Sequence, residues 1–181
     1  MKKYLPKLIF VVVTLLTISI VFASCKKESA VRLFYEGRSA YTAHSYEGAI
    51  YYLNRAIKID PEYAEAYFLR GMSYSRIKNY DEAISDYTKC IKYDSSHAEA
   101  YYWRGRAYYH LEDYSNAISN YNKAIKIDTD NIYYYYSRGT TYYLRDKNDD
   151  IYKAIDDYRK GCELGDKDSC EGLKDLLDLR R

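Results

Sequence analysis

The stretch Ala64-Glu-Ala-Tyr-Phe-Leu-Arg-Gly71-Met-Ser-Tyr74 decides the fold, because its pattern returns every 34 residues along the chain. The glycine of this stretch recurs at Gly37, Gly105 and Gly139. A large residue stands four positions before each glycine: Leu33, Tyr67, Tyr101 or Tyr135. A repeat of this length predicts a solenoid of helix pairs, since one such pair cannot bury its own apolar face.

A second pattern, downstream of the glycines, predicts the partner helix of each pair. Small residues stand 12 and 19 positions after the first three glycines and a large residue stands 16 positions after them: Ala49, Leu53 and Ala56; Ala83, Tyr87 and Cys90; Ala117, Tyr121 and Ala124. This spacing places the three residues on one helix face, where the small ones let two helices approach closely. Asp60, Asp94 and Asp128 end the first three units, and we expect them to cap the next helix.

We therefore predict an all-α solenoid of four helix-turn-helix units, followed by a C-terminal capping helix. The predicted units are 30–63, 64–97, 98–131 and 132–168, and the capping helix is 169–181. The fourth unit carries three extra residues near 146–150, which we expect to form a loop that includes Asp149 and Asp150. Leu173, Leu176 and Leu177 follow an i, i+3, i+4 pattern and would cover the open end of the last unit.

The quoted stretch, together with Asn79-Tyr80-Asp81-Glu82-Ala83-Ile84, resembles the tetratricopeptide repeat (TPR) family over residues 30–168. The resemblance implies a protein-interaction scaffold whose first helices line a concave groove that binds a peptide or a partner helix. Counting from the glycines projects the following residues into this groove: Phe34, Arg38, Phe68, Met72, Tyr102, Arg106, Tyr109, Tyr136 and Tyr143. Aromatic side chains and arginine dominate binding hot spots. The alternative for any one of these aromatic residues is packing against the neighbouring repeat.

Two further interpretations of the groove and its surroundings stay open. The tyrosine-rich groove could bind a glycan or a peptidoglycan ligand instead, and clustered Asp or Glu beside the aromatic rings would favour that function. Tyr121 and Tyr158 are expected on the convex side, where they would hold the fold. Arg70, Arg104 and Arg138 precede the glycines, and we expect them to pair internally with Asp86, Asn120 and Asp157.

The N-terminus has the layout of a secretory signal peptide over residues 1–24: a basic start, an apolar run and small residues. Cys25 follows Ala23 and Ser24 directly, and this arrangement resembles the bacterial lipoprotein signal, in which the cysteine is acylated and begins the mature chain. Residues 25–29 would then form a lipidated N-terminus and a short linker. An uncleaved transmembrane anchor is the alternative. Both interpretations place the repeats outside the cytoplasmic membrane, on an exported, membrane-anchored protein of the bacterial envelope.

Among the other cysteines, Cys90 occupies a small-residue position of the repeat and is expected to be buried. The sequence Lys160-Gly-Cys-Glu-Leu-Gly-Asp166 resembles the junctions of Sel1-like repeats, and this resemblance implies a disulfide between Cys162 and Cys170. Gly165 is expected to end one helix, and Asp168 or Ser169 to cap the next.

The sequence predicts no catalytic site. The sequence contains no nucleotide-binding loop, no nucleophile elbow and no catalytic triad, and its three histidines share no metal-ligand spacing, so we expect no enzyme, cofactor or metal site. Removal of residues 1–24 takes away three lysines and leaves 25 basic against 26 acidic residues, with no basic stripe. Nucleic acid is therefore not an expected partner. The sequence does not predict an oligomeric state.

Overall fold

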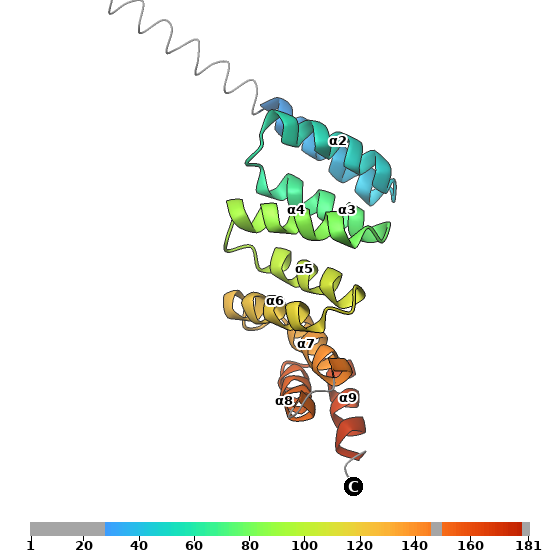
Figure 1. Ribbon diagram of the computed structural model, residues 1–181, viewed down its shortest axis with the longest axis vertical. Helices are drawn as coiled ribbons and strands as arrows, with labels where there is room; N and C mark the ends of the chain where they lie inside the picture. The colour runs from blue at the N-terminus through green and yellow to red at the C-terminus, as the bar shows by residue number, and fades with distance from the viewer. Residues whose placement is uncertain (1–27, 146–149, 179–181) are drawn as a thin grey trace, which may run out of the picture.

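The computed structural model describes residues 28–145 and 150–178, and these residues form an elongated stack of helices (Figure 1). A first helix covers residues 28–42 of the described part. It is followed by α2 (Tyr46–Ile59), α3 (Ala64–Arg76), α4 (Tyr80–Tyr93), α5 (Ala98–His110), α6 (Tyr114–Ile127), α7 (Ile132–Arg145), α8 (Asp150–Glu163) and α9 (Lys167–Asp178). No strand occurs in the described residues. The predicted all-α solenoid is confirmed.

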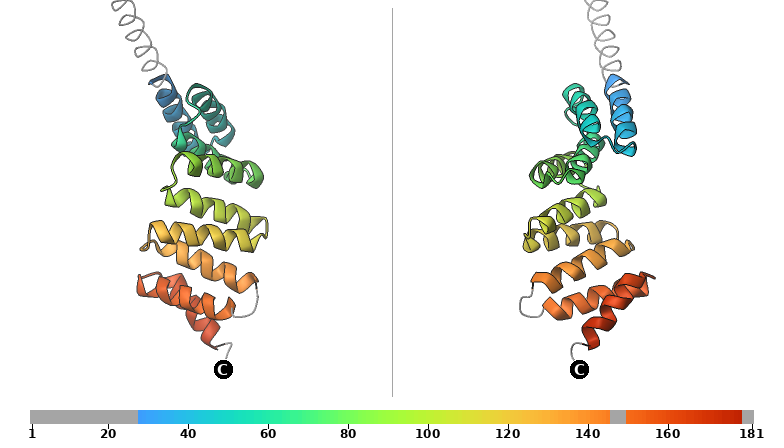
Figure 2. Two further views of the ribbon diagram at one scale, coloured as in Figure 1. Left: turned by 60° about the vertical axis from the view of Figure 1, so that its left-hand side comes forward. Right: turned by 90° about the vertical axis from the view of Figure 1, so that its right-hand side faces the viewer.

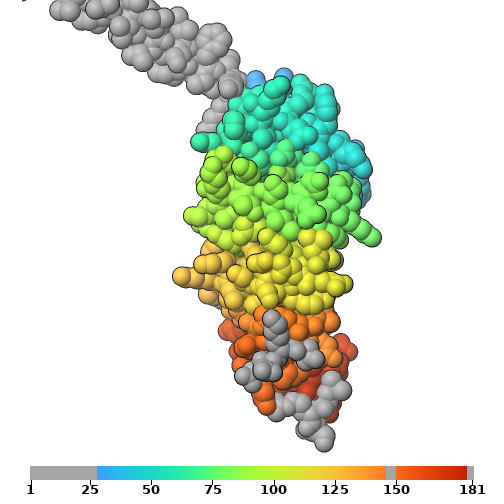
Figure 3. Space-filling model, viewed as in Figure 1, coloured from blue at the N-terminus to red at the C-terminus, as the bar shows by residue number. Residues whose placement is uncertain are grey.

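Each helix packs against its neighbours in the sequence, and successive units form bands along the long axis of the molecule (Figures 2 and 3). The first helices of successive units also touch, α3 with α5 and α5 with α7. This contact creates a continuous face built from first helices, as the repeat pattern predicts. The helix α9 lies at the end of the stack opposite the first helix (Figure 1).

A row of arginines ties the units together. Each arginine stands one position before the repeat glycine: Arg70 on α3, Arg104 on α5 and Arg138 on α7. Arg70 donates through Nη2 to Asp86 Oδ1 at 2.5 Å and through Nη1 to Asn54 Oδ1 at 2.5 Å. Its side chain therefore joins its own unit to the unit before. The predicted pairing with Asp86, Asn120 and Asp157 is confirmed. The added bonds to Asn54, Thr88 and Asn122 of the preceding units were not predicted.

The predicted capping role of Asp60, Asp94 and Asp128 is wrong. These residues are the C-caps of α2, α4 and α6, and each side chain accepts a backbone N–H two residues further along. The N-caps of α3 and α5 are instead Tyr63 and His97. The aspartates lie three residues before those caps, so they stabilise the turn between two units and do not reach the next helix.

The capping helix α9 starts two residues earlier than predicted. Asp166 accepts the backbone N–H of Ser169 at 2.9 Å through Oδ2, so Asp166 is the cap in place of Asp168 or Ser169. Gly165, with φ +97°, ends the preceding turn, as predicted. Leu176 is buried against α8 residues and Leu173 packs beside it, whereas Leu177 is 43% exposed and does not cover the last unit.

The three extra residues of the fourth unit fall largely at 146–149, outside the described residues, and Asp149 lies there as well. Asp150, expected in a solvated loop, is instead fully buried at the start of α8. Arg145 donates to both Asp150 oxygens, from Nε at 2.7 Å and from Nη2 at 2.8 Å. These two bonds satisfy a buried carboxylate and join the end of α7 to the start of α8.

Candidate functional site

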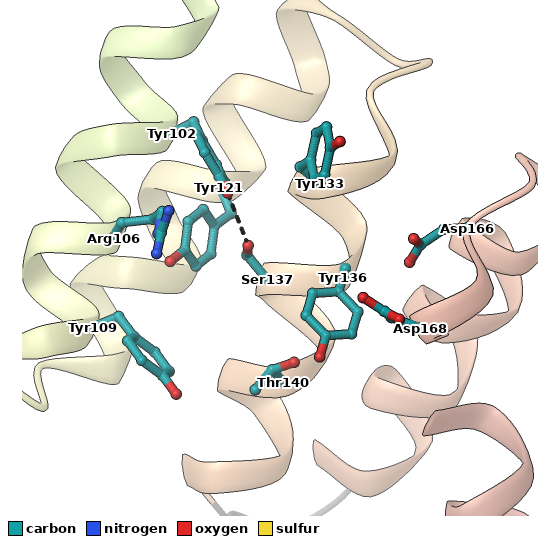
Figure 4. A pocket seen from close by; sticks show the side chains of 10 residues that line it. All are labelled: Tyr102, Arg106, Tyr109, Tyr121, Tyr133, Tyr136, Ser137, Thr140, Asp166 and Asp168. Carbon is teal, nitrogen blue, oxygen red and sulfur yellow. Dashed lines mark hydrogen bonds between the residues drawn. The ribbon is translucent and has the colours of Figure 1, made fainter. Parts of the chain in front are cut away.

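The candidate site is a pocket of about 370 Å³ between α5, α7 and the turn that leads into α9 (Figure 4). We call it the C-terminal pocket. Its lining residues are Tyr102, Arg106, Tyr109, Tyr121, Tyr133, Tyr136, Ser137, Thr140, Asp166 and Asp168. A volume of this size lies within the range of sites that bind small ligands or single side chains of a partner.

Tyrosines from α5, α6 and α7 line the C-terminal pocket. On the α5 side, the Tyr102 ring lies 5.9 Å from the Tyr121 ring and 4.9 Å from the Tyr134 ring. Its hydroxyl lies 3.3 Å from the hydroxyl of Ser137 on α7. Because ring contacts and a hydrogen bond hold Tyr102 on both sides, this wall is preorganised. Burial raises the pKa of Tyr121 above its ordinary value, so its hydroxyl stays protonated at alkaline pH values where an exposed tyrosine ionises.

Arg106 supplies the positive charge of the pocket. Its guanidinium lies over the Trp103 ring at 4.9 Å and near the Tyr102 ring at 6.0 Å. Both distances are typical of cation–π contacts. Figure 4 shows the side chain extending from α5 toward the Tyr121 ring. The guanidinium is thereby held on the α5 side of the pocket.

Two carboxylates form the opposite wall. Asp166 lies in the turn before α9, and Asp168 is an exposed residue of the first turn of α9. The Asp166 Oδ2 accepts bonds from the backbone N–H and the hydroxyl of Ser169. Both aspartates lie on the α9 side of the pocket, across from α5 (Figure 4). The pocket therefore carries opposite charges on its two sides.

The Cys162–Cys170 disulfide encloses this acidic wall. The two Cα atoms are 4.7 Å apart, and the bond joins the end of α8 to the first turn of α9. The structure thus contains the bond that the Sel1-like junction implies. Asp166 and Asp168 both lie inside the eight-residue separation that it closes. The bond limits how far the acidic wall can move from the end of α8.

A smaller pocket, of about 190 Å³, adjoins the first and shares Arg106 with it. We call it the central pocket; it is lined by Met72, Ser75, Arg76, Tyr80, Trp103, Arg106, Ala107 and His110. Arg76 donates to the Tyr41 hydroxyl at 3.1 Å. The His110 ring stacks on Tyr80 at 4.8 Å. Burial, together with the nearby charges of Arg106 and Lys78, lowers the pKa of His110 below its usual value.

The structure brings five of the nine projected groove residues into these pockets: Met72, Tyr102, Arg106, Tyr109 and Tyr136. The other four line neither pocket. Phe34 packs against Tyr63 with ring centres 5.1 Å apart, and Phe68 packs against His97 at 4.5 Å. Tyr63 and His97 are the N-caps of α3 and α5, and the two phenylalanines also pack against clusters that include Ala66 and Ala100 of the next units. For these two, the alternative of packing against the neighbouring repeat holds.

The remaining two projected residues are exposed. Arg38 lies over the ring of Tyr35, on its own helix, at 4.6 Å. Tyr143 is 46% exposed near the end of α7.

Sequence reasoning missed several pocket residues, above all Tyr133, Ser137, Asp166 and Asp168. Tyr121, expected on the convex side, reaches the C-terminal pocket from α6 although it is 1% exposed. Tyr133 and Ser137 stand six and two positions before Gly139, and a wider projection from the glycine would have found them. The two aspartates follow the α7–α8 helix pair at the end of the last unit, so no position counted from the glycine signals them.

Among the described residues, no group of three or more His, Cys, Asp and Glu side chains is arranged to hold a metal ion. None of the described helices combines the length and apolarity needed to cross a membrane. The predicted signal peptide and Cys25 lie outside the described residues.

Comparison with known proteins shows which family shares this architecture. A family model described as Tetratricopeptide repeat matches residues 70–132, and a model described as TPR repeat matches residues 41–78. No curated protein matches the sequence. The crystal structure of MamA protein is 25% identical, with a TM-score of 0.76 over 83% of this chain and 82% of that one.

Two further solved structures share the fold. MamA residues 41 to the end from Desulfovibrio magneticus RS-1 are 24% identical, with a TM-score of 0.69 over 75% of each chain. The first TPR of Spaghetti (RPAP3), bound to the HSP90 peptide SRMEEVD, is 21% identical. Its TM-score is 0.66 over 67% of this chain and 96% of that one.

Proposed function

This chain belongs to the tetratricopeptide repeat family, and we propose that it is a non-catalytic scaffold that binds a segment of another protein in its groove. The groove is formed by the central and C-terminal pockets, which meet at Arg106. The observation that carries the proposal is the composition of this surface: tyrosine and tryptophan rings around one shared arginine. Such side chains provide most of the binding energy in protein interfaces.

The size and continuity of the groove support a peptide-like occupant. The two pockets together extend from α3, across α5, to α9. An extended or helical segment that crosses several first helices could place successive side chains in the two pockets. The RPAP3 structure shows that another protein of this fold is bound to a peptide. At this low identity the two chains share the fold alone, so the proposal of a peptide ligand is based on the pockets of this chain.

One observation favours a second candidate, glycan binding. Asp166 and Asp168 lie in the same pocket as Tyr133 and Tyr136, and tyrosine rings beside carboxylates are suited to stack on sugar rings and accept bonds from their hydroxyls. Arg106 lines the same pocket, and the enrichment of arginine in protein-binding hot spots favours a protein ligand. A glycan array read with the wild-type protein distinguishes the two candidates.

The location proposed for this scaffold is the bacterial cell envelope, with Cys25 as the acylated first residue of the mature chain. The support is the apolar run that ends in small residues directly before a single cysteine. Two or more acyl chains would give stable anchoring, whereas one gives only marginal binding. Cys25→Ala is expected to abolish palmitate labelling and to leave an uncleaved precursor. Labelling that persists in this variant contradicts the lipoprotein proposal.

The scaffold proposal is tested by crosslinking in membranes, followed by mass spectrometry of the captured proteins. The variant is Tyr102→Ala with Arg106→Ala, which removes one wall and the shared charge of the groove. The matched control is Tyr51→Ala with Arg55→Ala, which removes an exposed tyrosine–arginine pair on α2 that lines neither pocket. Circular dichroism verifies folding of both. Partners lost only in the groove variant support the proposal, and unchanged capture of every partner contradicts it.

A further inference from the structure

We infer that the C-terminal pocket selects a protein segment by a basic side chain, Arg or Lys, seated between the tyrosines of α7 and the carboxylates at the start of α9. This inference rests on the proposed function and names the chemistry of its occupant. The C-terminal pocket has Arg106 on its α5 side and Asp166 and Asp168 on its α9 side (Figure 4).

The aromatic part of the argument comes from α7. Tyr133 and Tyr136 both line the pocket, and Tyr133 is 62% exposed. A ring that is open to solvent and lines the same pocket as two carboxylates is a favourable surface for a cation, because the face of the ring is negative. An arginine or lysine stem also buries its methylene groups against such rings while its charged end reaches a polar group.

The electrostatic part comes from the turn before α9 and the first turn of that helix. The charged side chains that line the pocket are two carboxylates and one guanidinium, so their net charge is −1 and they attract a cationic ligand. Asp166 uses Oδ2 to cap α9, whereas Asp168 is exposed and forms no ion pair within the described residues. Asp168 is therefore the carboxylate that is placed to meet an incoming guanidinium or ammonium group.

The neighbouring central pocket fixes where along a bound segment the basic residue must lie. Arg76, Arg106 and His110 line that pocket, and it contains no acidic side chain. A basic residue of the partner would be repelled there and attracted at the α9 end. The charges of the groove thus predict that the basic residue of a bound segment lies in the C-terminal pocket. Repulsion between like charges excludes it from the central pocket, and this fixes the register of the segment.

The disulfide makes the acidic wall suitable for selection. Cys162 and Cys170 close the turn that carries both aspartates. A wall held in place before binding loses less conformational freedom when the ligand arrives. The tyrosine wall is held as well, since Tyr136 packs on Tyr158 with ring centres 5.8 Å apart.

The test is selection of random dodecapeptides displayed on phage by the full-length protein, followed by affinity measurements on the selected peptides as synthetic probes. We expect Arg or Lys to be enriched at one position. Asp168→Lys should weaken binding of these peptides by about tenfold or more, because attraction becomes repulsion. Asp175→Lys is the matched control: this exposed acidic residue is also on α9 but lines neither pocket. It should leave the affinity within about twofold.

The outcomes separate this inference from the proposed function. Peptides that bind in competition with each other and depend on Tyr102 and Arg106, but carry no enriched basic residue, overturn the inference and leave the scaffold function standing. Failure to select any groove-dependent peptide overturns both. Binding of a glycan that depends on Tyr133 and Asp168 also overturns the inference. Melting curves of the variants show whether a loss of binding reflects a loss of fold.

Discussion

Gly105 lies directly against the ring of Tyr121. A Cβ placed on Gly105 would come within 2.8 Å of Tyr121 Cε1 and 3.1 Å of the Ala117 carbonyl oxygen. The same relationship holds one repeat earlier, where a Cβ on Gly71 would lie 2.8 Å from Tyr87 Cε1. The repeated glycine is therefore the contact point of the two helices in each unit. The large residue 16 positions later fills the space in the first three units, and Tyr158, 19 positions after Gly139, does so in the fourth.

Gly105→Leu should therefore overpack the contact between α5 and α6. We expect a loss of about 1–3 kcal/mol in the free energy of unfolding, because the ring and the α6 backbone would have to shift. Urea denaturation followed by circular dichroism measures the change. Ser119→Leu adds the same side chain on the exposed face of α6 and should have little effect. Equal stability of the glycine variant and the wild type would show that the packing argument is wrong.

The arginine row allows a comparison of a charged and a neutral partner. Asp86 makes an ion pair with Arg70, whereas Asn120 accepts from Arg104 without an opposite charge. Burial opposes the charge of Arg70, but its bonds to Asp86 raise its pKa, whereas burial lowers the pKa of Arg104. Arg70→Ala should cost about 3–5 kcal/mol, because it strands a buried carboxylate. Arg104→Ala should cost about 1–3 kcal/mol. Equal losses would contradict this difference.

The loss of stability caused by Arg70→Ala should be smaller at acidic pH. Burial already raises the pKa of Asp86 in spite of Arg70, and loss of the guanidinium removes the group that lowers it. A carboxyl group with a raised folded pKa binds more protons in the folded than in the unfolded state, so the variant gains stability as the pH falls through that pKa. Urea midpoints of Arg70→Ala and Arg104→Ala, compared at pH 7 and near pH 4.5, test this. The difference in urea midpoint between the two variants should be smaller at the acidic pH, and an unchanged difference would refute the expectation.

The helix pairs and their internal contacts could be predicted because each unit repeats the same local physics. Gly71 and Tyr87 stand at fixed positions of one unit, and the same pair recurs at Gly105 and Tyr121. The arginine partners in the same unit followed from the same spacing. Interactions inside a repeat depend on short sequence distances, and a period of 34 residues fixes them.

The candidate site could be predicted only in part, because it depends on how units are rotated against one another. Tyr102 and Phe68 stand at equivalent repeat positions, yet Tyr102 lines the C-terminal pocket and Phe68 packs against His97. The acidic wall comes from Asp166 and Asp168, which follow the α7–α8 helix pair of the last unit and are not among the positions counted from its glycine. The small rotation per unit and the position of α9 arise from tertiary packing, which a repeat pattern does not encode.

The buried tyrosines predict a loss of stability in alkali. Burial raises the pKa of Tyr134 to about 12 and raises those of Tyr87 and Tyr121 further, whereas an unfolded tyrosine ionises near pH 10. Between about pH 10 and pH 12 the unfolded chain therefore binds fewer protons, and stability falls with rising pH. Each group contributes up to about 1.4 kcal/mol per pH unit.

Urea midpoints measured from pH 8 to pH 11 test this expectation, and absorbance at 295 nm follows the formation of tyrosinate. The midpoint should stay constant below pH 9 and fall above pH 10. Tyr121→Phe removes one of the titrating hydroxyls and should make the fall shallower, with little change in the pH at which it begins. A midpoint that is the same at pH 9 and pH 11 would contradict the assignment of these tyrosines as buried and protonated.

The Cys162–Cys170 bond should be a stabilising element of the C-terminal end. Replacing both cysteines by serine frees a short loop in the unfolded chain, and we expect a loss of roughly 2–3 kcal/mol in the free energy of unfolding. The loss should be accompanied by weaker binding in the C-terminal pocket, since the loop carries Asp166 and Asp168. Thiol counting checks the bond directly. Burial raises the pKa of Cys90 to about 12, so this thiol should react only after denaturation.

In exported protein that is denatured without reductant, one reactive thiol, Cys90, is expected, because Cys25 would carry lipid and the other two cysteines are bonded. Reduction should raise the number of reactive thiols to three, and the double serine variant should show one thiol with or without reductant. Three reactive thiols before reduction would show that the bond does not form in the exported protein. In that case the acidic wall would be held by the capping bonds of Asp166 alone, and the serine replacements should change neither stability nor binding.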